Sequence, residues 1–411
     1  MAKQWHHFWQ GERLPLPMKI CRIKGPAISC QIFTSLSPVA DIWDGLLPEA
    51  HRLRSPGLIA LENSNLPDIE FAYLLVYQHN FPIGLIYFQK INFNQSHYNH
   101  SILEREDLSL IKKMILKQKA DILICGNLYH NDSPGFYFKN EGDQDLVPNL
   151  IQQFKKSNPW KSTFCATMLK DIEIPFAPDS LKKVGFKSYT EDVLMELDLR
   201  EEWKSFDDYL SALSKKYVQR AGKIRMAGKK LIRKMLSLTE IEQNASCLEK
   251  LYLQIAQKQK VRIGKLSAGY FAEMKRAYQS DFELIAYFDD ATIVAFASYF
   301  MRDNRSLEIH YIGLDYARND SFKLYFNILF DGIEMAIQRK CSSVLFGRTS
   351  EDAKASAGAH AKHPLHYIHL KLGLPAFIFH YLQKWHSQNQ STTWKSRNPF
   401  KERAIPELLL A

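Results

Sequence analysis

The sequence lacks the short motifs by which several enzyme classes are recognised. Its 411 residues contain no H-E-x-x-H, no G-x-x-x-x-G-K-[ST], no G-x-S-x-G and no G-x-G-x-x-G. Zinc hydrolases, nucleotide hydrolases, serine hydrolases and dinucleotide-binding enzymes therefore lack support. The six cysteines include no C-x-x-C pair, and most lie among apolar residues. This pattern predicts reduced, buried thiols in a cytoplasm.

Long apolar runs are also missing. The longest, such as residues 291–300, are about ten residues, well short of the roughly 20 that span a bilayer. The amino terminus has no apolar core followed by small residues, so we expect no secretory signal. We expect a cytoplasmic protein without a transmembrane segment, which can lie at the inner membrane face as a peripheral protein.

The length and the order of predicted elements indicate two domains. Strand and helix patterns alternate in the first half, and the order restarts near residue 193. The second half then shows long helices, three successive strands at 282–288, 292–300 and 306–314, a helix at 321–339 and two more strands. We expect an α/β (α+β) fold of two tandem domains with mixed sheets. They cover residues 1–190 and 191–385, and a carboxy-terminal tail covers 386–411.

Positive charge concentrates in one stretch of the second half. Residues 209–239 contain nine Lys and Arg and no Asp or Glu, whereas the whole chain has a net charge of +10. The apolar spacing predicts a long basic helix over residues 206–234. Its basic part, residues 215–234, is either a solvated face or a binding surface for an anionic partner: the phosphate of an acyl carrier, transfer RNA or an anionic lipid surface.

Two short segments carry a resemblance to a known family. SKKYVQR (residues 214–220) and FGRTSEDAK (residues 346–354), followed by Gly358-Ala359, resemble motifs of GNAT-like acyltransferases related to peptidoglycan biosynthesis. In the first half, CGNL (125–128) and GFYF (135–138) are similar to another segment of that family. These proteins are similar to the Fem-type aminoacyltransferases, which pair two GNAT-like domains. The resemblance implies the tandem GNAT-like fold and an acyl-transfer activity.

The candidate site residues follow from the motifs and the resemblance. Arg348 comes directly after a strand, where α/β folds place ligand sites, and its guanidinium can bind a carboxylate or phosphate. Glu308 and His310 lie two residues apart on a strand and share a face, so either can remove a proton from an acceptor amine. The remaining candidates are Asp352 as a catalytic residue, Thr349, Lys354, Lys216, Tyr217, Arg220 and Lys223 for substrate, and Asn319 and Ser321 for a cofactor. Thr349 and Asp352 can instead simply cap the helix that follows.

The sequence gives no indication of a metal or a permanently bound cofactor. His360, His363, His366 and His369 recur every third residue, but in a strand this spacing alternates faces, and Pro364 blocks a helix. The turn at 315–321 has no glycine for a pyrophosphate. Acyl-CoA and aminoacyl-tRNA remain open as co-substrates.

We therefore expect an N-acyltransferase that moves an acyl or aminoacyl group, by direct attack, onto an amine of a lipid- or cell-wall-type acceptor. The alternatives are an aminoacyl-tRNA-dependent transferase and a non-catalytic protein with a degenerate GNAT fold that binds anionic glycans or lipids.

Overall fold

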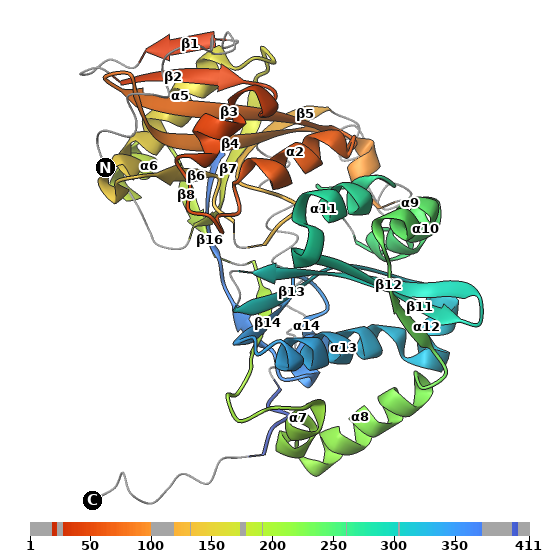
Figure 1. Ribbon diagram of the computed structural model, residues 1–411. Helices are drawn as coiled ribbons and strands as arrows, with labels where there is room; N and C mark the ends of the chain where they lie inside the picture. Colours follow the sequence, from red (N-terminus) through yellow and green to blue (C-terminus); the bar gives the residue numbers. More distant parts are fainter. Residues whose placement is uncertain are drawn as a thin grey trace, which may run out of the picture.

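The structure is a computed structural model that describes residues 19–22, 28–99, 119–131, 133–172, 178–190, 192–259, 261–302, 305–371 and 397–401. Two mixed β-sheets with helices packed on them form two domains that lie one above the other (Figure 1). The predicted α/β fold with two mixed sheets is confirmed. Among the described residues, no helix is long and apolar enough to cross a membrane.

The first sheet contains nine described strands in the order β1-β2-β3-β4-β5-β7-β16-β8, with β6 beside β4. Its strands are β1 (Lys19–Arg22), β2 (Ile28–Phe33), β3 (Ile69–Gln78), β4 (Phe81–Phe93), β5 (Ala120–Cys125), β6 (Phe136–Phe138), β7 (Phe164–Ile172), β8 (Lys187–Tyr189) and β16 (Leu365–Leu370). The described α-helices of this domain are α1 (Ala40–Asp44), α2 (Ser55–Asn63), α5 (Val147–Ser157) and α6 (Pro178–Lys183). Strands β3 and β4 form a hairpin whose turn residues, His79 and Asn80, have φ of 49° and 69°, the left-handed conformation that two-residue hairpin turns require.

The second sheet has seven described strands in the order β10-β11-β12-β13-β14-β9-β15. They are β9 (Leu194–Asp198), β10 (Ile232–Met235), β11 (Phe282–Asp289), β12 (Thr292–Arg302), β13 (Ser306–Leu314), β14 (Ser343–Gly347) and β15 (His360–Lys362). The helices are α7 (Phe206–Ala212), α8 (Lys215–Ala227), α9 (Leu238–Gln243), α10 (Ala245–Ala256), α11 (Tyr270–Tyr278), α12 (Tyr316–Phe322), α13 (Leu324–Gln338) and α14 (Glu351–Ser356). The three successive strands predicted at 282–314 are present as the antiparallel meander β11-β12-β13.

The last described strand does not belong to the second domain. Strand β16 lies within the range 191–385, yet it pairs with β7 and β8 of the first sheet. Figure 1 shows this segment leaving the lower domain and entering the upper one. The chain therefore returns to the first domain at β16, where apolar side chains such as Tyr367 complete the core of the first sheet, and the described tail residues 397–401 lie again on the second domain.

The predicted long helix over residues 206–234 is wrong. It breaks into α7 and α8, and residues 232–235 form the edge strand β10. The break falls at Leu213 and Ser214, which hydrogen-bond to the described tail residues 397–401: Ser214 N–H donates to Pro399 C=O at 2.8 Å, and Leu213 forms a β-bridge with Phe400. Gly228 then ends α8. The tail thus takes hydrogen bonds that a continuous helix would need.

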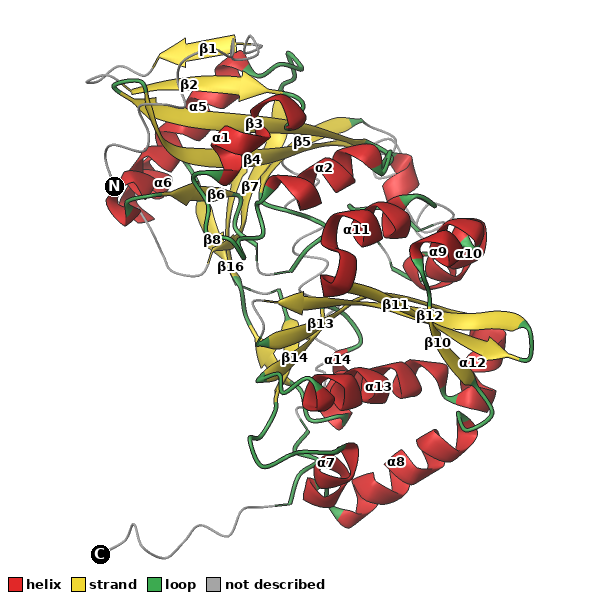
Figure 2. Cartoon of the chain, in the orientation of Figure 1, coloured by secondary structure: helices red, strands yellow, loops and turns green. Residues whose placement is uncertain are grey.

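A single apolar core joins the two domains. It contains Trp43, Leu58 and Tyr73 of the first domain together with Tyr270 and Phe296 of the second. Helices α2 and α11 lie side by side at its centre (Figure 2). A Cβ atom on Gly57 would lie 1.9 Å from the Tyr278 hydroxyl, so α2 can approach α11 this closely only with glycine there. The domains are therefore held in fixed register around the space between their sheets.

Candidate functional site

The candidate site begins where two parallel strands separate. Strands β13 and β14 pair only over residues 306–308 and 343–345. Beyond that point β13 has a bulge opposite Ser298, whose hydroxyl accepts from the Tyr311 N–H at 3.0 Å. Bulges bend their strand and re-aim side chains. Residues 309–314 and 346–348, which we call the fork, then diverge around an open space.

A cavity of about 1060 Å³ occupies this fork and extends to the first domain. Its walls are mostly apolar and come from both domains, with Ile122, Leu128 and Met168 on one side and Ile309 and Ile312 on the other. Ligand pockets usually measure about 300–1,000 Å³. This cavity can therefore hold the reacting parts of two molecules.

The segment after β14 is shaped by backbone conformation and by a buried lysine. Gly347, Thr349 and Ser350 have φ of 75°, 67° and 56°, a conformation that costs free energy at the two non-glycine positions. Lys354, 3% exposed, holds the segment: its Nζ donates to the carbonyl oxygens of Gly347 at 3.0 Å and of Arg348 at 2.7 Å. This tight turn directs the Arg348 side chain towards the first domain.

Arg348 binds three side chains: two of the first domain, and Asp192 of the linker, the short segment between β8 and β9. Its Nε donates to Asp192 at 2.6 Å and its Nη2 to Asp171 at 2.8 Å, while Nη1 donates to the side-chain oxygen of Asn131. Burial alone would lower the pKa of Arg348, but Asp171 and Asp192 outweigh it and raise that pKa. The guanidinium is therefore fully charged at the edge of the cavity and already neutralised by two carboxylates.

His366 completes this ion-pair group from strand β16. Its Nδ1 accepts from the Asp171 backbone N–H at 3.0 Å, so the ring hydrogen of the neutral form lies on Nε2, which is 3.1 Å from Asp192 Oδ2. Lys170 donates to Asp171 and to the carbonyl oxygen of His130 at 2.9 Å. A first-domain strand, the linker and β16 thus all meet at Arg348.

A second polar group lies on the other side of Asn131. Glu308, 0% exposed, accepts from Asn131 Nδ2 at 2.8 Å and from both terminal nitrogens of Arg52 at 3.2 Å. Burial raises the pKa of Glu308, but Arg52 foremost, with His310 and Arg302, outweighs it and holds that pKa well below its usual value. Glu308 is therefore an ionised, fully paired carboxylate.

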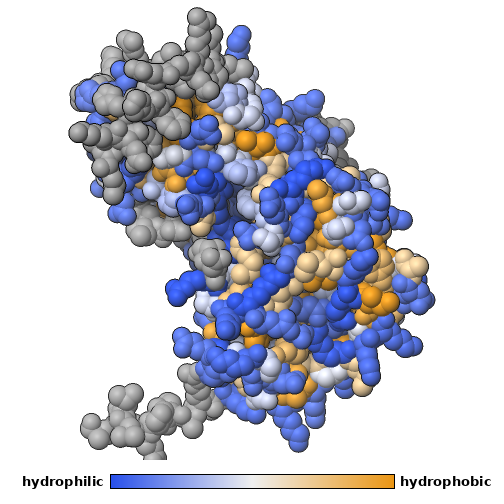
Figure 3. Space-filling model, viewed as in Figure 1, coloured by the Kyte–Doolittle hydropathy of each residue, from blue (hydrophilic) through white to orange (hydrophobic). Residues whose placement is uncertain are grey.

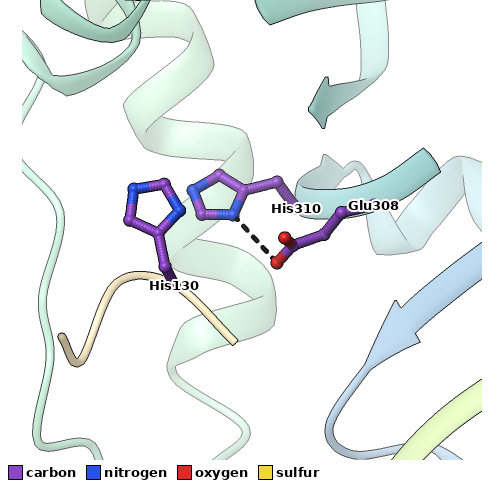
Figure 4. A group of neighbouring side chains, drawn as sticks. All are labelled: His130, Glu308 and His310. Carbon is purple, nitrogen blue, oxygen red and sulfur yellow. Dashed lines mark ion pairs between the residues drawn. The ribbon is translucent and has the colours of Figure 1, made fainter. Parts of the chain in front are cut away.

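His310 lies between Glu308 and an aromatic wall (Figure 4). Its Nδ1 is 3.5 Å from Glu308, its Nε2 is 2.7 Å from the Tyr270 hydroxyl, and the His130 ring stacks on it at 5.0 Å. Burial lowers the pKa of His310 although Glu308 opposes the shift. The residue is among those that line the cavity, but its imidazole is only 1% exposed, neutral and engaged at both nitrogens.

Lys354 has the titration behaviour that a base at neutral pH needs. Burial foremost, with Arg348 adding to it and Glu351 opposing, lowers the pKa of Lys354 to about 7. The residue lines the cavity. In a substantial fraction of the protein molecules, Lys354 is therefore an uncharged amine at pH 7.

Two groups of described side chains lie close enough together to hold a cation. They are His130 with Glu308 and His310, and Asp171 with Asp192 and His366. In each group an arginine already pairs with the carboxylates, Arg52 in the first and Arg348 in the second. A cation would have to displace that arginine, so neither donor set fits a metal in this arrangement.

The other predicted residues lie at different distances from the cavity. Thr349 and Asn319 line it, and the side-chain oxygen of Asn319 accepts from the Tyr325 N–H at 3.1 Å. Ser321, on the same helix α12, is not among the lining residues. Asp352 lies on the first turn of α14, away from the lining, and pairs with Arg397 at 3.3 Å.

The basic residues of α8 lie outside the cavity, next to one of its walls. Lys216, Tyr217, Arg220 and Lys223 are absent from the lining. The Arg220 guanidinium lies 4.7 Å from the ring centre of Phe326, which does line it. The structure therefore brings together five predicted residues at the cavity: Arg348, Thr349, Lys354, Asn319 and His310. Glu308 lies behind it, and Asp352, Ser321 and the α8 residues lie outside.

Several residues of the site were missed from the sequence. They are Arg52, Asn131, Lys170, Asp171, Asp192, Tyr270 and His366. The one usable signal was the charged pair Lys170-Asp171 near the end of an otherwise apolar strand, FCATMLKDI, because buried charges are rarely found without a partner. The others come from separate segments that only the fold brings together.

No protein-family model and no curated protein matches the sequence. Solved structures similar to the chain include FemX, with 10% identity, a TM-score of 0.48 and coverage of 89% of this chain and 99% of that one. They also include L-PGS from Bacillus licheniformis (13% identity, TM-score 0.43, coverage 82% and 96%) and a tandem GNAT protein from the clavulanic acid biosynthesis pathway (9%, 0.46, coverage 84% and 98%). FemX and a tandem GNAT protein are thus among the solved structures that this chain resembles.

Proposed function

We propose that the chain is an N-acyltransferase that moves an acyl or aminoacyl group, by direct attack, onto an amine of a lipid- or cell-wall-type acceptor. The observation that carries the proposal is the cavity in the fork between β13 and β14, walled by both domains. Past residues 308 and 345 the facing strand edges no longer pair with each other. An extended donor can therefore lie between the two strands, as in strand addition.

The walls match an acyl group and an acceptor that are both largely apolar. Isoleucine, leucine and aromatic side chains of both domains surround the polar end at Arg348 and Asn131. Burial of apolar surface stabilises a bound acyl chain by roughly 25 cal/mol per Å². Two molecules held side by side in one cavity react with the advantage of proximity.

Lys354 is the proton acceptor that the geometry favours. In direct transfer the amine nitrogen attacks the carbonyl carbon, the bond to the donor's leaving group breaks, and the amine loses a proton. A lysine with a pKa of about 7 on the cavity wall can take that proton. The Cys165 thiol also lines the cavity, but burial raises its pKa, which disfavours the thiolate of a covalent intermediate.

Glu308 and His310 remain candidates from the sequence, and their surroundings favour a positioning role. Both nitrogens of His310 are engaged, and Glu308 is paired with Arg52 and Asn131. In this role they fix the Asn131 amide, which in turn binds Arg348.

The donor stays open between acyl-CoA and aminoacyl-tRNA. The turn before α12 offers little to a pyrophosphate, because the side chain of Asp315 already accepts the hydrogen bond of the Ala317 N–H at its first turn. Asn319 and Lys323 still line the cavity beside this helix and can contact the polar part of a donor.

An anionic partner is proposed at residues 215–235, which we call the basic segment. Its exposed lysines 215, 216, 223, 229 and 230 form no ion pair with any described residue. Met226, Ile232 and Met235 of the same segment are 71%, 61% and 50% exposed. Figure 3 shows the largely hydrophilic surface, with apolar residues among it, of the lower domain that carries α8. Exposed apolar side chains among lysines favour an anionic lipid surface over RNA.

One observation favours a second candidate, a binding protein without catalytic activity. Arg348 is already neutralised by Asp171 and Asp192, so it has no free charge for a substrate anion in this conformation. A protein that only binds its ligand would retain the cavity and use none of the proton chemistry of Lys354.

Transfer assays separate the two candidates. Purified protein is incubated with radiolabelled decanoyl-CoA or a mixture of aminoacyl-tRNAs, and with phosphatidylethanolamine or a lysine-containing peptide as the amine. We expect an amide product detectable by mass spectrometry. Lys354→Met should lower turnover by about 100-fold with little change in substrate affinity. If the protein binds these molecules but forms no amide with any pair, the binding-protein candidate replaces the transferase.

A further inference from the structure

One arginine on the cavity wall, Arg262, has two side-chain nitrogens without a hydrogen-bond partner among the described residues. These two nitrogens, Nε and Nη1, are buried. The residue lines the cavity and takes part in no ion pair with a described residue. The residue as a whole is half-buried, but buried nitrogens of a charged group without a partner are costly, so these two require an explanation.

The surroundings of Arg262 hold it in place without neutralising it. Its backbone N–H donates to the His97 carbonyl oxygen at 2.8 Å, and Val261 forms a β-bridge with Tyr98 of the first domain. The nearby carboxylate of Asp68 already forms an ion pair with Lys265 at 2.6 Å. His97 adds a third buried nitrogen without a hydrogen bond, Nε2, which lies 4.0 Å from Asp68 Oδ2. This end of the cavity therefore has donors in excess of acceptors.

Neighbouring titrations agree with an uncompensated positive charge. Burial foremost, then Lys265, with Arg262 contributing, lowers the pKa of His97 to about 4. Burial raises the pKa of Tyr252, and Arg262 opposes that rise. The lining of the cavity that contains Arg262 also includes the apolar side chains Phe93, Tyr98, Ile255 and Ile263.

We propose that Arg262 binds the carboxylate or phosphate group of an amphipathic ligand whose apolar body lies in the cavity. A guanidinium suits both oxyanions and forms its strongest hydrogen bonds with them in a dry site. The anion neutralises the charge that the protein leaves unpaired, and the apolar wall excludes water around the pair. The inference rests on the proposed function only in naming this ligand as a substrate.

Calorimetric titration with three probes of equal chain length tests the proposal: octanoate, octyl phosphate and uncharged octanol. Wild-type protein should bind at least one anion more tightly than octanol. Arg262→Gln should weaken that binding by about tenfold or more and leave octanol binding unchanged. Arg276→Gln, which removes one exposed arginine of α11 paired with Glu242 and Glu273, is the matched control and should bind all three probes as the wild type does. The tighter anion identifies the source as a carboxylate or a phosphate.

Thermal unfolding of the ligand-free protein gives a second, independent measurement. Arg262→Met replaces an unpaired buried charge by an apolar side chain of similar length, so the unfolding temperature should stay equal or rise. A clear fall would show that the protein itself pairs the guanidinium, and would overturn the proposal. So would equal binding of the anions by wild type and Arg262→Gln, or no preference over octanol. Anion binding through Arg262 without any acyl transfer would refute the proposed function and leave this inference in place.

Discussion

The side-chain amide of Asn131 binds Arg348 through its oxygen and Glu308 through its nitrogen. One residue of the first domain thus connects the two strands of the fork at the point where they separate. Both of its partners are charged, and amides bonded to charged groups contribute more than neutral pairs do. Asn131 therefore fixes the width of the fork and the relative position of the domains.

Replacing Asn131 should destabilise the protein. Asn131→Ala leaves the Arg348 Nη1 without its partner and the Glu308 Oε1 with only the His310 Nδ1 at 3.5 Å. The expected cost is about 2–4 kcal/mol in the free energy of unfolding. Urea denaturation measures this loss. Asn140→Ala removes an exposed asparagine of the same domain and should change stability by less than about 0.5 kcal/mol. Equal effects of the two substitutions would contradict the bridging role.

The buried Lys354 should make stability rise with pH. Its pKa is about 7 in the folded protein and 10.5 for an ordinary exposed lysine, so between these values the unfolded chain binds one proton more than the folded one. Stability therefore increases as pH rises through this window, by at most about 1.4 kcal/mol per unit. Denaturation of wild type and Lys354→Met at pH 7.5 and 9.5 measures the effect. Between the two pH values the free energy of unfolding should increase more for the wild type than for the variant. Equal increases would show that Lys354 is charged in the folded protein at both pH values.

Removing Arg348 should affect stability as much as binding. Arg348→Ala leaves Asp171, which is fully buried, with one cation fewer, and the loss of one member of a buried ion pair costs about 3–5 kcal/mol. Arg348→Lys cannot reach both carboxylates and should recover only part of the loss. Arg318→Ala, which breaks a surface pair with Asp289, should be nearly neutral. If Arg348→Ala leaves the free energy of unfolding unchanged, other cations must compensate the charge of the two carboxylates.

The basic segment should bind anionic membranes. The triple variant Lys216→Glu, Arg220→Glu and Lys223→Glu should lose co-sedimentation with phosphatidylglycerol vesicles, and binding of the wild type should weaken as salt is added. Met226→Ser should weaken binding without changing charge, whereas Phe81→Ser, a control at another exposed apolar residue, should not. Unchanged vesicle binding by the triple variant, together with lost binding to transfer RNA, would identify RNA as the partner.

The sequence predicted the order of elements well where local pattern decides it. The meander of residues 282–314, the helix after it and the strand ending at Gly347 follow apolar periodicity and turn residues, and all are present. The prediction of one long helix was wrong because the break between α7 and α8 depends on Pro399 and Phe400, almost 190 residues away. Strand β16 was placed in the wrong domain because pattern shows that a strand exists and not which sheet it joins.

The candidate site was predicted only in its second-domain half. Arg348, Thr349 and Lys354 stand in one short motif, so the sequence displays them together. Their partners Asn131, Asp171 and Asp192 come from three separate segments and carry no motif of their own. The buried environment of Lys354, which decides its protonation, depends on packing that no local pattern reveals.

The crossing of β16 sets the order in which the chain can fold as it leaves the ribosome. Strand β16 lies between β7 and β8 in the first sheet, but it is synthesised long after them. The first sheet therefore stays incomplete until all strands of the second sheet have been synthesised. A chain cut after residue 364 would keep every residue of the second sheet and still have an unfinished first one. Synthesis of residues 365–370, rather than of the first half, is therefore the step after which the amino-terminal domain can reach its final stability.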